Sequence, residues 1–202
     1  MNRRFIYALL AGAFASCVLL NVATASTIWT GPTITFSKAS NADPTQTANQ
    51  DHLTSLVALT RASTQGMFNI AQESSFASTS PKDTAWATSI NNPSQTITAT
   101  NFAALTFTTW QLAYGGSGSL NTNITTHNAV VHLLTDDIYL NLSFTSFQSG
   151  SGGAFTYQRS TPVPEPTTIC LSLIGLVATV SWAMLRARFD GRPARNCDLV
   201  TN

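Results

Sequence analysis

Two histidines and two aspartates stand closest together among the side chains that could bind a metal ion. His127 and His132 are five residues apart, and Asp136 and Asp137 follow them. Residues five apart in a β-strand point to opposite faces, so the two imidazoles should not meet at one zinc ion. One pair of aspartates also supplies too few oxygens for calcium, which takes roughly six to eight. We therefore predict a solvated turn at these aspartates and no bound metal.

Catalysis would need an acid–base pair or a nucleophile elsewhere. Glu73 and one of the aspartates could hydrolyse a glycosidic bond if they lay about 5–10 Å apart in a cleft. Ser117 lies between Gly116 and Gly118, but residues 115–120 are typical of a hairpin loop and not of the strand-to-helix turn around a nucleophilic serine. The sequence also contains no glycine-rich loop followed by Lys-Ser or Lys-Thr. We expect no catalytic residue and no cofactor.

Six large aromatic side chains in the middle of the chain allow two interpretations. If they are exposed on one sheet face, they would stack against sugar rings, as in a carbohydrate-binding module. If they are buried, they belong to the core of a β-sheet. We favour the core and keep sugar stacking as the alternative. The six are Trp29, Trp86, Trp110, Tyr114, Tyr139 and Tyr157.

Residues 26–161 form the part of the chain that must position these side chains. This region holds no cysteine, because the three cysteines are Cys17, Cys170 and Cys197, so we expect no disulfide and no cysteine-bound metal in it. Threonine, β-branched and aromatic residues, together with many glycines and asparagines, favour strands and tight turns over helices.

An alternation of period two marks the clearest strand, in which Ile138, Leu140, Leu142 and Phe144 share one face. With the apolar run before it, this predicts a β-hairpin at residues 129–147, followed by a third strand at 154–159. Further strands are predicted at 33–37, 55–61, 67–71 and 104–112, with loops at 39–50 and 77–95 and a short helix at 71–77 or 82–89 as an alternative. The expected fold class is all-β, an antiparallel β-sandwich of jelly-roll-like type.

The first 25 residues are typical of a secretory signal peptide. Arg3 and Arg4 precede an apolar run, and small residues at Ala23 and Ala25 suit a signal peptidase that cuts before Ser26. A lipoprotein signal at Cys17 is a minor alternative, because the residues before it lack the usual aliphatic side chain. We predict that residues 1–25 are removed during export.

The other end of the chain predicts a membrane span. Residues 167–185 carry no charge and, as a helix, would approach the thickness of a bilayer core. Arginines that flank a span stay on the cytoplasmic side, so residues 26–161 should lie outside the cytoplasm. These arginines are Arg186, Arg188, Arg192 and Arg195.

Three prolines at positions 162, 164 and 166 precede this span and disfavour both helix and sheet. The motif Val163, Pro164, Glu165, Pro166, followed at once by one span and an arginine cluster, resembles the PEP-CTERM sorting signal of Gram-negative bacteria. The resemblance covers residues 162–195, and residues 196–202 form a short tail beyond it. It implies processing near the proline motif by an exosortase, a membrane cysteine transpeptidase. A plain C-terminal membrane anchor is the alternative.

The exported region carries a second, weaker resemblance, to exported bacterial surface proteins of unassigned function. That resemblance implies no activity. It rests on residues 49–53, 60–73, 134–140 and 155–161.

The low charge of the chain narrows its function further. Only 9% of its residues are charged and its net charge is +1, which excludes a nucleic-acid binder that relies on a basic surface. We therefore expect a non-enzymatic protein that passes through the inner membrane to the cell surface or the extracellular matrix of a biofilm. Its expected partners are signal peptidase, exosortase and extracellular polysaccharide. A secreted carbohydrate-binding module is the first alternative, and a polysaccharide hydrolase is the second.

Overall fold

The computed structural model describes residues 25–163, which nearly coincide with the predicted exported region. The predicted signal peptide up to Thr24, the motif residues after Val163, the span at 167–185 and the arginine cluster lie outside the described residues. No helix within residues 25–163 is both long enough and apolar enough to cross a membrane.

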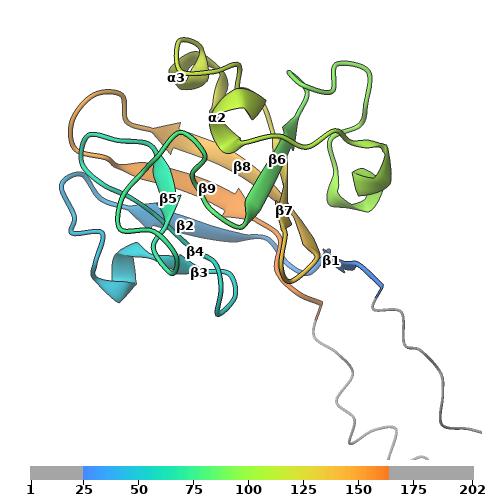
Figure 1. Cartoon of the computed structure of the whole chain (residues 1–202), viewed down its shortest axis with the longest axis horizontal. Coiled ribbons are helices and arrows are strands. Elements are labelled where there is room, and N and C mark those ends of the chain that lie inside the picture. Colours follow the sequence, from blue (N-terminus) through green and yellow to red (C-terminus); the bar gives the residue numbers. More distant parts are fainter. Residues whose placement is uncertain (1–24, 164–202) are drawn as a thin grey trace, which may run out of the picture.

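Strands dominate the described residues, which confirms the all-β prediction (Figure 1). The helical segments are short: η1 (Thr47–Asn49), η2 (Ala99–Ala104), α2 (Trp110–Ala113) and α3 (Leu120–Asn123). The strands are β1 (Thr27–Trp29), β2 (Ile34–Lys38), β3 (Asp51–His52), β4 (Ala58–Arg61), β5 (Met67–Asn69), β6 (Thr84–Thr88), β7 (Ala129–Leu133), β8 (Ile138–Phe147) and β9 (Phe155–Arg159).

The larger sheet has the order β2-β9-β8-β7-β6, and these neighbours pair antiparallel. The predicted hairpin is confirmed as β7 and β8, in which Val131 faces Leu140, and the third predicted strand is β9. β1 adds a short parallel pairing to the beginning of β8. The predicted alternation also holds, because Leu140, Leu142 and Phe144 are buried.

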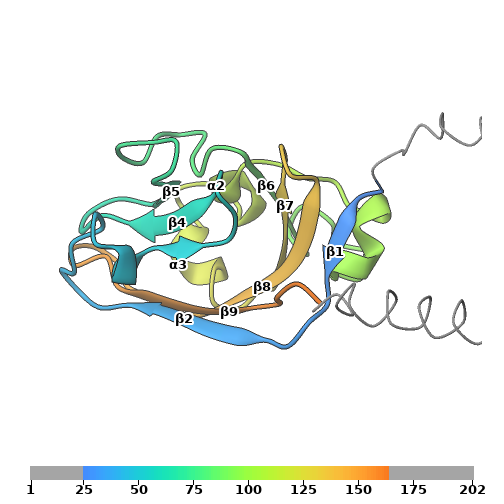
Figure 2. The same cartoon turned by 90° about the horizontal axis from the view of Figure 1, so that it is seen from below.

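The smaller sheet has the order β3-β4-β5 and lies over the larger one (Figure 2). Side chains of both sheets belong to one hydrophobic cluster, in which Leu59 and Met67 of the small sheet pack with residues of the large sheet such as Phe144. Burial of each such side chain contributes about 1.5–3 kcal/mol to the free energy of unfolding. The burial of apolar side chains between the two sheets therefore stabilises the two-layered arrangement.

Two predicted segments were wrong. Residues 84–88 form β6, although a loop at 77–95 or a helix at 82–89 was expected. This strand is buried on both faces, with Trp86 in one apolar cluster and Ala87 in another, so it lacks the alternation that marks a half-exposed strand. The strand expected at 104–112 is a single bridge from Thr108 to Trp86, followed by helix α2.

The connections between strands also differ from a jelly roll. Strands β6 to β9 lie side by side in chain order, and so do β3 to β5. Each sheet therefore contains a meander, whereas a jelly roll is built from two Greek keys.

The two ends of the described chain meet at one end of the molecule (Figures 1 and 2). The Gly31 N–H donates to the Thr161 carbonyl at 2.8 Å, and the Thr161 hydroxyl donates to the Pro32 carbonyl at 2.7 Å. β1 pairs with the first residues of β8, so the ten residues of β8 lead away from the chain ends over roughly 30 Å. The turn at residues 148–154 therefore lies at the opposite end of the molecule.

Candidate functional site

The two aspartates predicted to lie in a turn, Asp136 and Asp137, are in the connection between β7 and β8, whereas His132 lies in β7 itself. Asp137 adopts a positive φ of 49° in this connection and accepts a hydrogen bond from the Ser26 hydroxyl at 2.7 Å. The hydrogen bond from Ser26 is the main cause of the lowered pKa of Asp137. A hydrogen bond with His132 at 3.0 Å lowers this pKa further. The His132 ring stacks on Tyr139 with 4.0 Å between centroids, whereas His127 lies beyond α3 and contacts Thr126 and the Asn123 carbonyl. Both histidines and Asp137 are thus engaged in local structure.

Glu73, the candidate acid for glycoside hydrolysis, holds the connection between β5 and β6. Its carboxylate accepts hydrogen bonds from the Asn69 N–H at 2.8 Å, from the Lys82 N–H at 2.9 Å and from the Ser80 hydroxyl. Both of its oxygens are used by this loop. Ser117 lies in the connection between α2 and α3, which is a link between two helices and not the hairpin expected.

The six large aromatic side chains are core residues, as favoured. Each is at most 8% exposed, so they offer no platform for sugar stacking. Trp86, for example, is fully buried, and its ring stacks on Phe144 with 6.4 Å between the ring centroids.

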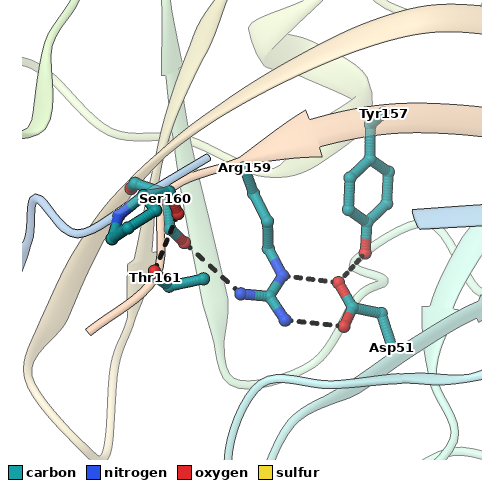
Figure 3. A network of polar contacts seen from close by, with 6 residues as sticks. Asp51, Tyr157, Arg159, Ser160 and Thr161 are labelled. Atoms are coloured by element: carbon teal, nitrogen blue, oxygen red, sulfur yellow. Dashed lines mark hydrogen bonds and ion pairs between the residues drawn. The ribbon is translucent and has the colours of Figure 1, made fainter. Parts of the chain in front are cut away.

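Asp51, Tyr157 and Arg159 form a buried polar network that joins the two sheets (Figure 3). Arg159 of β9 donates from Nε at 2.6 Å and from Nη2 at 2.8 Å to the carboxylate of Asp51 in β3, and the Tyr157 hydroxyl donates to the same carboxylate at 2.7 Å. Burial opposes the charge on Arg159, but the bonds to Asp51 raise the pKa of this guanidinium. Both carboxylate oxygens of Asp51 and two nitrogens of Arg159 bond to each other across the sheets, so we name this network the clamp.

Arg61, the last residue of β4, differs from Arg159 because it is 4% exposed yet bonds only to carbonyl groups. Its Nε donates to the Gln65 carbonyl at 2.6 Å, and its Nη1 donates to the carbonyls of Gln148 at 2.8 Å and Ala154 at 3.3 Å. Among residues 25–163, the ion pairs are His132 with Asp137 and Arg159 with Asp51, and Arg61 joins neither. Arg61 is therefore a buried cation whose charge is not balanced by a carboxylate in contact with it.

A bulge in β8 creates one wall of this site. The pairing of β8 with β9 shifts between Phe144 and Ser146, so one extra residue enters the strand. That residue reverses the alternation and turns Phe147 to the side of the sheet on which Phe144 lies. The guanidinium of Arg61 then lies over the Phe147 ring, 3.8 Å from its centroid, in a cation–π contact.

Glycines close the site on two sides. Gly153, with a φ of 65°, passes so close to the Ala62 carbonyl that a side chain would collide with it. At Gly66 a Cβ atom would lie 2.6 Å from the Phe76 ring and 2.7 Å from Trp110. These approaches bring the loops after β4 and after β8 around the guanidinium.

A cavity of about 430 Å³ opens at Arg61. The third nitrogen of the guanidinium, Nη2, makes no hydrogen bond within the described part of the chain, and it is not sealed from solvent. The half-buried rings of Phe76 and Phe147 supply apolar wall. The complete lining is Arg61, Thr64, Gln65, Gly66, Phe76, Leu120, Asn121, Phe147 and Gly150.

A second positive charge lies near the cavity. Lys38 ends β2, is 2% exposed and bonds only weakly to the Ala39 carbonyl at 3.5 Å. Burial and then the charge of Arg61 lower the pKa of Lys38, while the exposed carboxylate of Asp43 acts in the opposite direction. Burial also lowers the pKa of Arg61 to about 10, so the guanidinium remains protonated at neutral pH. The local field therefore favours an anion.

A polar groove of about 340 Å³ lies on the outer face of the large sheet, between Asn141, Ser143 and Gln158. Several of its side chains bond to one another or to the backbone. The Ser143 hydroxyl donates to Asn128 at 2.7 Å, and Asn141 accepts the Ala99 N–H at 2.8 Å. Unlike the Arg61 cavity, this groove contains no buried cation that lacks a carboxylate partner among the described residues, since Arg159 in its lining is paired with Asp51.

Sequence reasoning did not single out Arg61. A signal for it was present, because residues 26–161 contain only four Lys or Arg side chains and Arg61 follows the apolar run 56–59 after one threonine. A charge at the end of a buried strand in a region so poor in charge indicates a specific role.

Comparisons of the chain with protein-family models, with curated proteins and with solved structures found no significant match.

Proposed function

We propose that this chain is an exported, non-enzymatic protein of the cell surface or extracellular matrix, sorted by an exosortase through its C-terminal tail. The observation that carries the proposal is the order of three features directly after the folded domain. A proline motif at 162–166 comes first, then the uncharged segment 167–185, then the arginine cluster. This order resembles the PEP-CTERM sorting signal.

The placement of the domain ends supports this proposal. Thr161 is bonded to the start of the domain, whereas Val163 is 53% exposed. The proposed processing points, before Ser26 and near Pro164, therefore border the folded domain at the same end. A domain whose two ends leave together can stand on the membrane while both are processed.

We infer a binding or structural role for the two-layered β-sandwich itself. Both carboxylate oxygens of Glu73 accept hydrogen bonds from the loop between β5 and β6, which disfavours the hydrolase alternative. A carbohydrate-binding module is the second candidate, and it is favoured by the cavity at Arg61.

Intact mass spectrometry of the chain expressed in an exosortase-bearing host tests the sorting proposal. We expect a product that begins at Ser26 and ends near Pro164. Changing Pro164, Glu165 and Pro166 together to alanine should leave the C-terminal 40 or so residues attached and the protein in the membrane. Pro162→Ala, just before the motif, is the control and should be processed normally. Normal processing of the triple variant would refute the sorting signal, and a mature chain that keeps residues 167–185 would indicate a plain anchor.

A further inference from the structure

The unbalanced charge of Arg61 identifies the chemistry of a ligand. A guanidinium binds carboxylate, sulfate and phosphate groups through planar, charge-assisted hydrogen bonds, and here Nη2 is the donor that remains. The other two nitrogens are held by carbonyl groups, and the plane is held against Phe147, so the donor is fixed before any ligand arrives. A fixed donor loses little conformational entropy when it binds.

The number of charges in the cavity favours a monoanion. Arg61 is the charged residue in the lining, and Lys38 lies outside the lining and acts through space. A phosphate dianion would call for several cations in contact with it, whereas a carboxylate matches one guanidinium. The ligand group is therefore best matched by a carboxylate.

The rest of the lining fits a sugar ring. A volume of about 430 Å³ lies within the usual range of small-molecule sites and exceeds what a bare carboxylate fills. Thr64 and Gln65 can exchange hydrogen bonds with hydroxyl groups, and so can the side-chain oxygen of Asn121, whose nitrogen donates to the Ser149 hydroxyl at 3.3 Å. The rings of Phe76 and Phe147 can pack against C–H groups. A ring that carries both hydroxyl groups and one carboxylate is a uronic acid.

The cavity also faces away from the chain ends. Phe147 and Gly150 lie at the far end of β8 from β1, whereas residues 25–31 and 161–163 lie at the near end. A domain held by its C-terminal side would present this cavity outward.

We propose that the cavity at Arg61 binds the carboxylate of a uronic acid residue in an acidic polysaccharide. The Nη2 atom of Arg61 donates to the carboxylate, and Thr64, Gln65 and Asn121 contact the sugar hydroxyls. Assignment to a polysaccharide rests on the proposed function, since it takes the domain to be exported to the matrix; the anion site itself does not.

Gly150 allows a clean test of the charge. It lines the cavity, and a Cβ atom there would meet nothing within 4 Å. Its φ of 76° is one that aspartate and asparagine adopt more readily than other side chains. Gly150→Asp therefore places a competing carboxylate at the cavity, while Gly150→Asn is the matched neutral control of the same shape.

Isothermal titration calorimetry on the full chain in mild detergent, with a glucuronic acid oligomer as the probe, gives the readout. We expect binding that the uncharged glucose oligomer does not show. Gly150→Asp should weaken it about tenfold or more, and Gly150→Asn should stay within about threefold of the original protein. Arg61→Lys keeps the positive charge but loses the planar set of donors of the guanidinium, so it should also bind about tenfold more weakly. Thermal unfolding checks that this variant is folded.

Three results would overturn the proposal. They are equal binding of the uncharged oligomer, no difference between the two Gly150 variants, and binding of inorganic sulfate without binding of the uronate. Because this experiment uses the purified full chain, failure to bind uronate leaves the sorting proposal intact. A chain that stays unprocessed in the exosortase-bearing host but binds uronate would refute sorting alone.

Discussion

Arg61 and Arg159 are buried to nearly the same extent, but their surroundings give them different energetic roles. Arg159 meets a carboxylate with two hydrogen bonds, while Arg61 meets carbonyl groups and an aromatic face. The pair with Asp51 compensates the desolvation of both charges within the protein. At Arg61 the protein compensates the desolvation of the charge only in part, and under our proposal a bound anion supplies the rest.

Asp51→Asn should destabilise the domain strongly, because it leaves Arg159 buried without its counter-charge. We expect a loss of about 3 kcal/mol or more in the free energy of unfolding, measured by urea denaturation with tryptophan fluorescence. Asp43→Asn is the control, since Asp43 is exposed and its contacts with Thr45 suit an amide as well. It should change stability by about 0.5 kcal/mol or less. Equal effects of the two variants would contradict the role of the clamp.

The buried tyrosines predict a loss of stability at high pH. Burial raises the pKa of Tyr114, and burial together with the charge of Asp51 raises that of Tyr157. A group whose pKa is higher in the folded state stabilises the fold at low pH, and this contribution falls as the pH rises above its unfolded value, about 10 for tyrosine. The unfolding temperature should therefore fall steeply above about pH 10.

Tyr114→Phe separates the two contributions to this loss. The Tyr114 hydroxyl is buried without a hydrogen-bond partner among the described residues, so its removal should not cost stability at pH 7. Thermal unfolding scans between about pH 8 and 11 should show a shallower decline for this variant than for the original protein. An unchanged slope would show that Tyr114 does not remain protonated in the folded state.

Among the structural elements, the loop between β8 and β9 is the one on which the Arg61 site depends most. Gly153→Ala forces a side chain into a positive φ and against the Ala62 carbonyl, so we expect a loss of about 2 kcal/mol or more and weaker uronate binding. Gly118→Ala is the control, because a Cβ atom there meets nothing and φ is not positive. It should leave stability within about 0.5 kcal/mol by thermal unfolding. A harmless Gly153→Ala would mean that the loop can move away from β4.

Elements with one buried face were predictable from the sequence, and the others were not. The alternation from Ile138 to Phe144 predicted β8, because one side of that strand is apolar and the other is polar. The sequence did not predict β6, because this strand is buried on both faces. It also did not predict β1, which has three residues, or β3, which has two, because such short strands show no alternation. The Arg61 cavity is assembled from helix α3 and from the ends of, or the loops after, β4, β5 and β8, and one of its walls depends on a bulge that no local sequence pattern predicts.

For the molecule as a whole, the last residue bonded to the domain is expected to mark its stable boundary. A chain that stops after Val163 should unfold at the same temperature as the full chain. One that stops after Gln158 loses Arg159, the clamp and the contact of Thr161 with Gly31, and should unfold at a markedly lower temperature. Differential scanning calorimetry measures both. A much lower unfolding temperature for the chain that stops after Val163 than for the full chain would show that the tail contributes to the fold.

The pairing of the first strands with the last ones also governs when the domain can fold. β1 pairs with β8 and β2 with β9, and the Thr161 hydroxyl reaches back 129 residues to Pro32. Contacts this distant along the chain form late, because closing so long a loop is entropically costly. A chain that enters an export channel from its N-terminus therefore has no means of completing this sheet until its last strand arrives. If the chain is exported as proposed, this topology keeps the polypeptide unfolded during passage, and the sheet is completed only after the last strand has crossed the membrane.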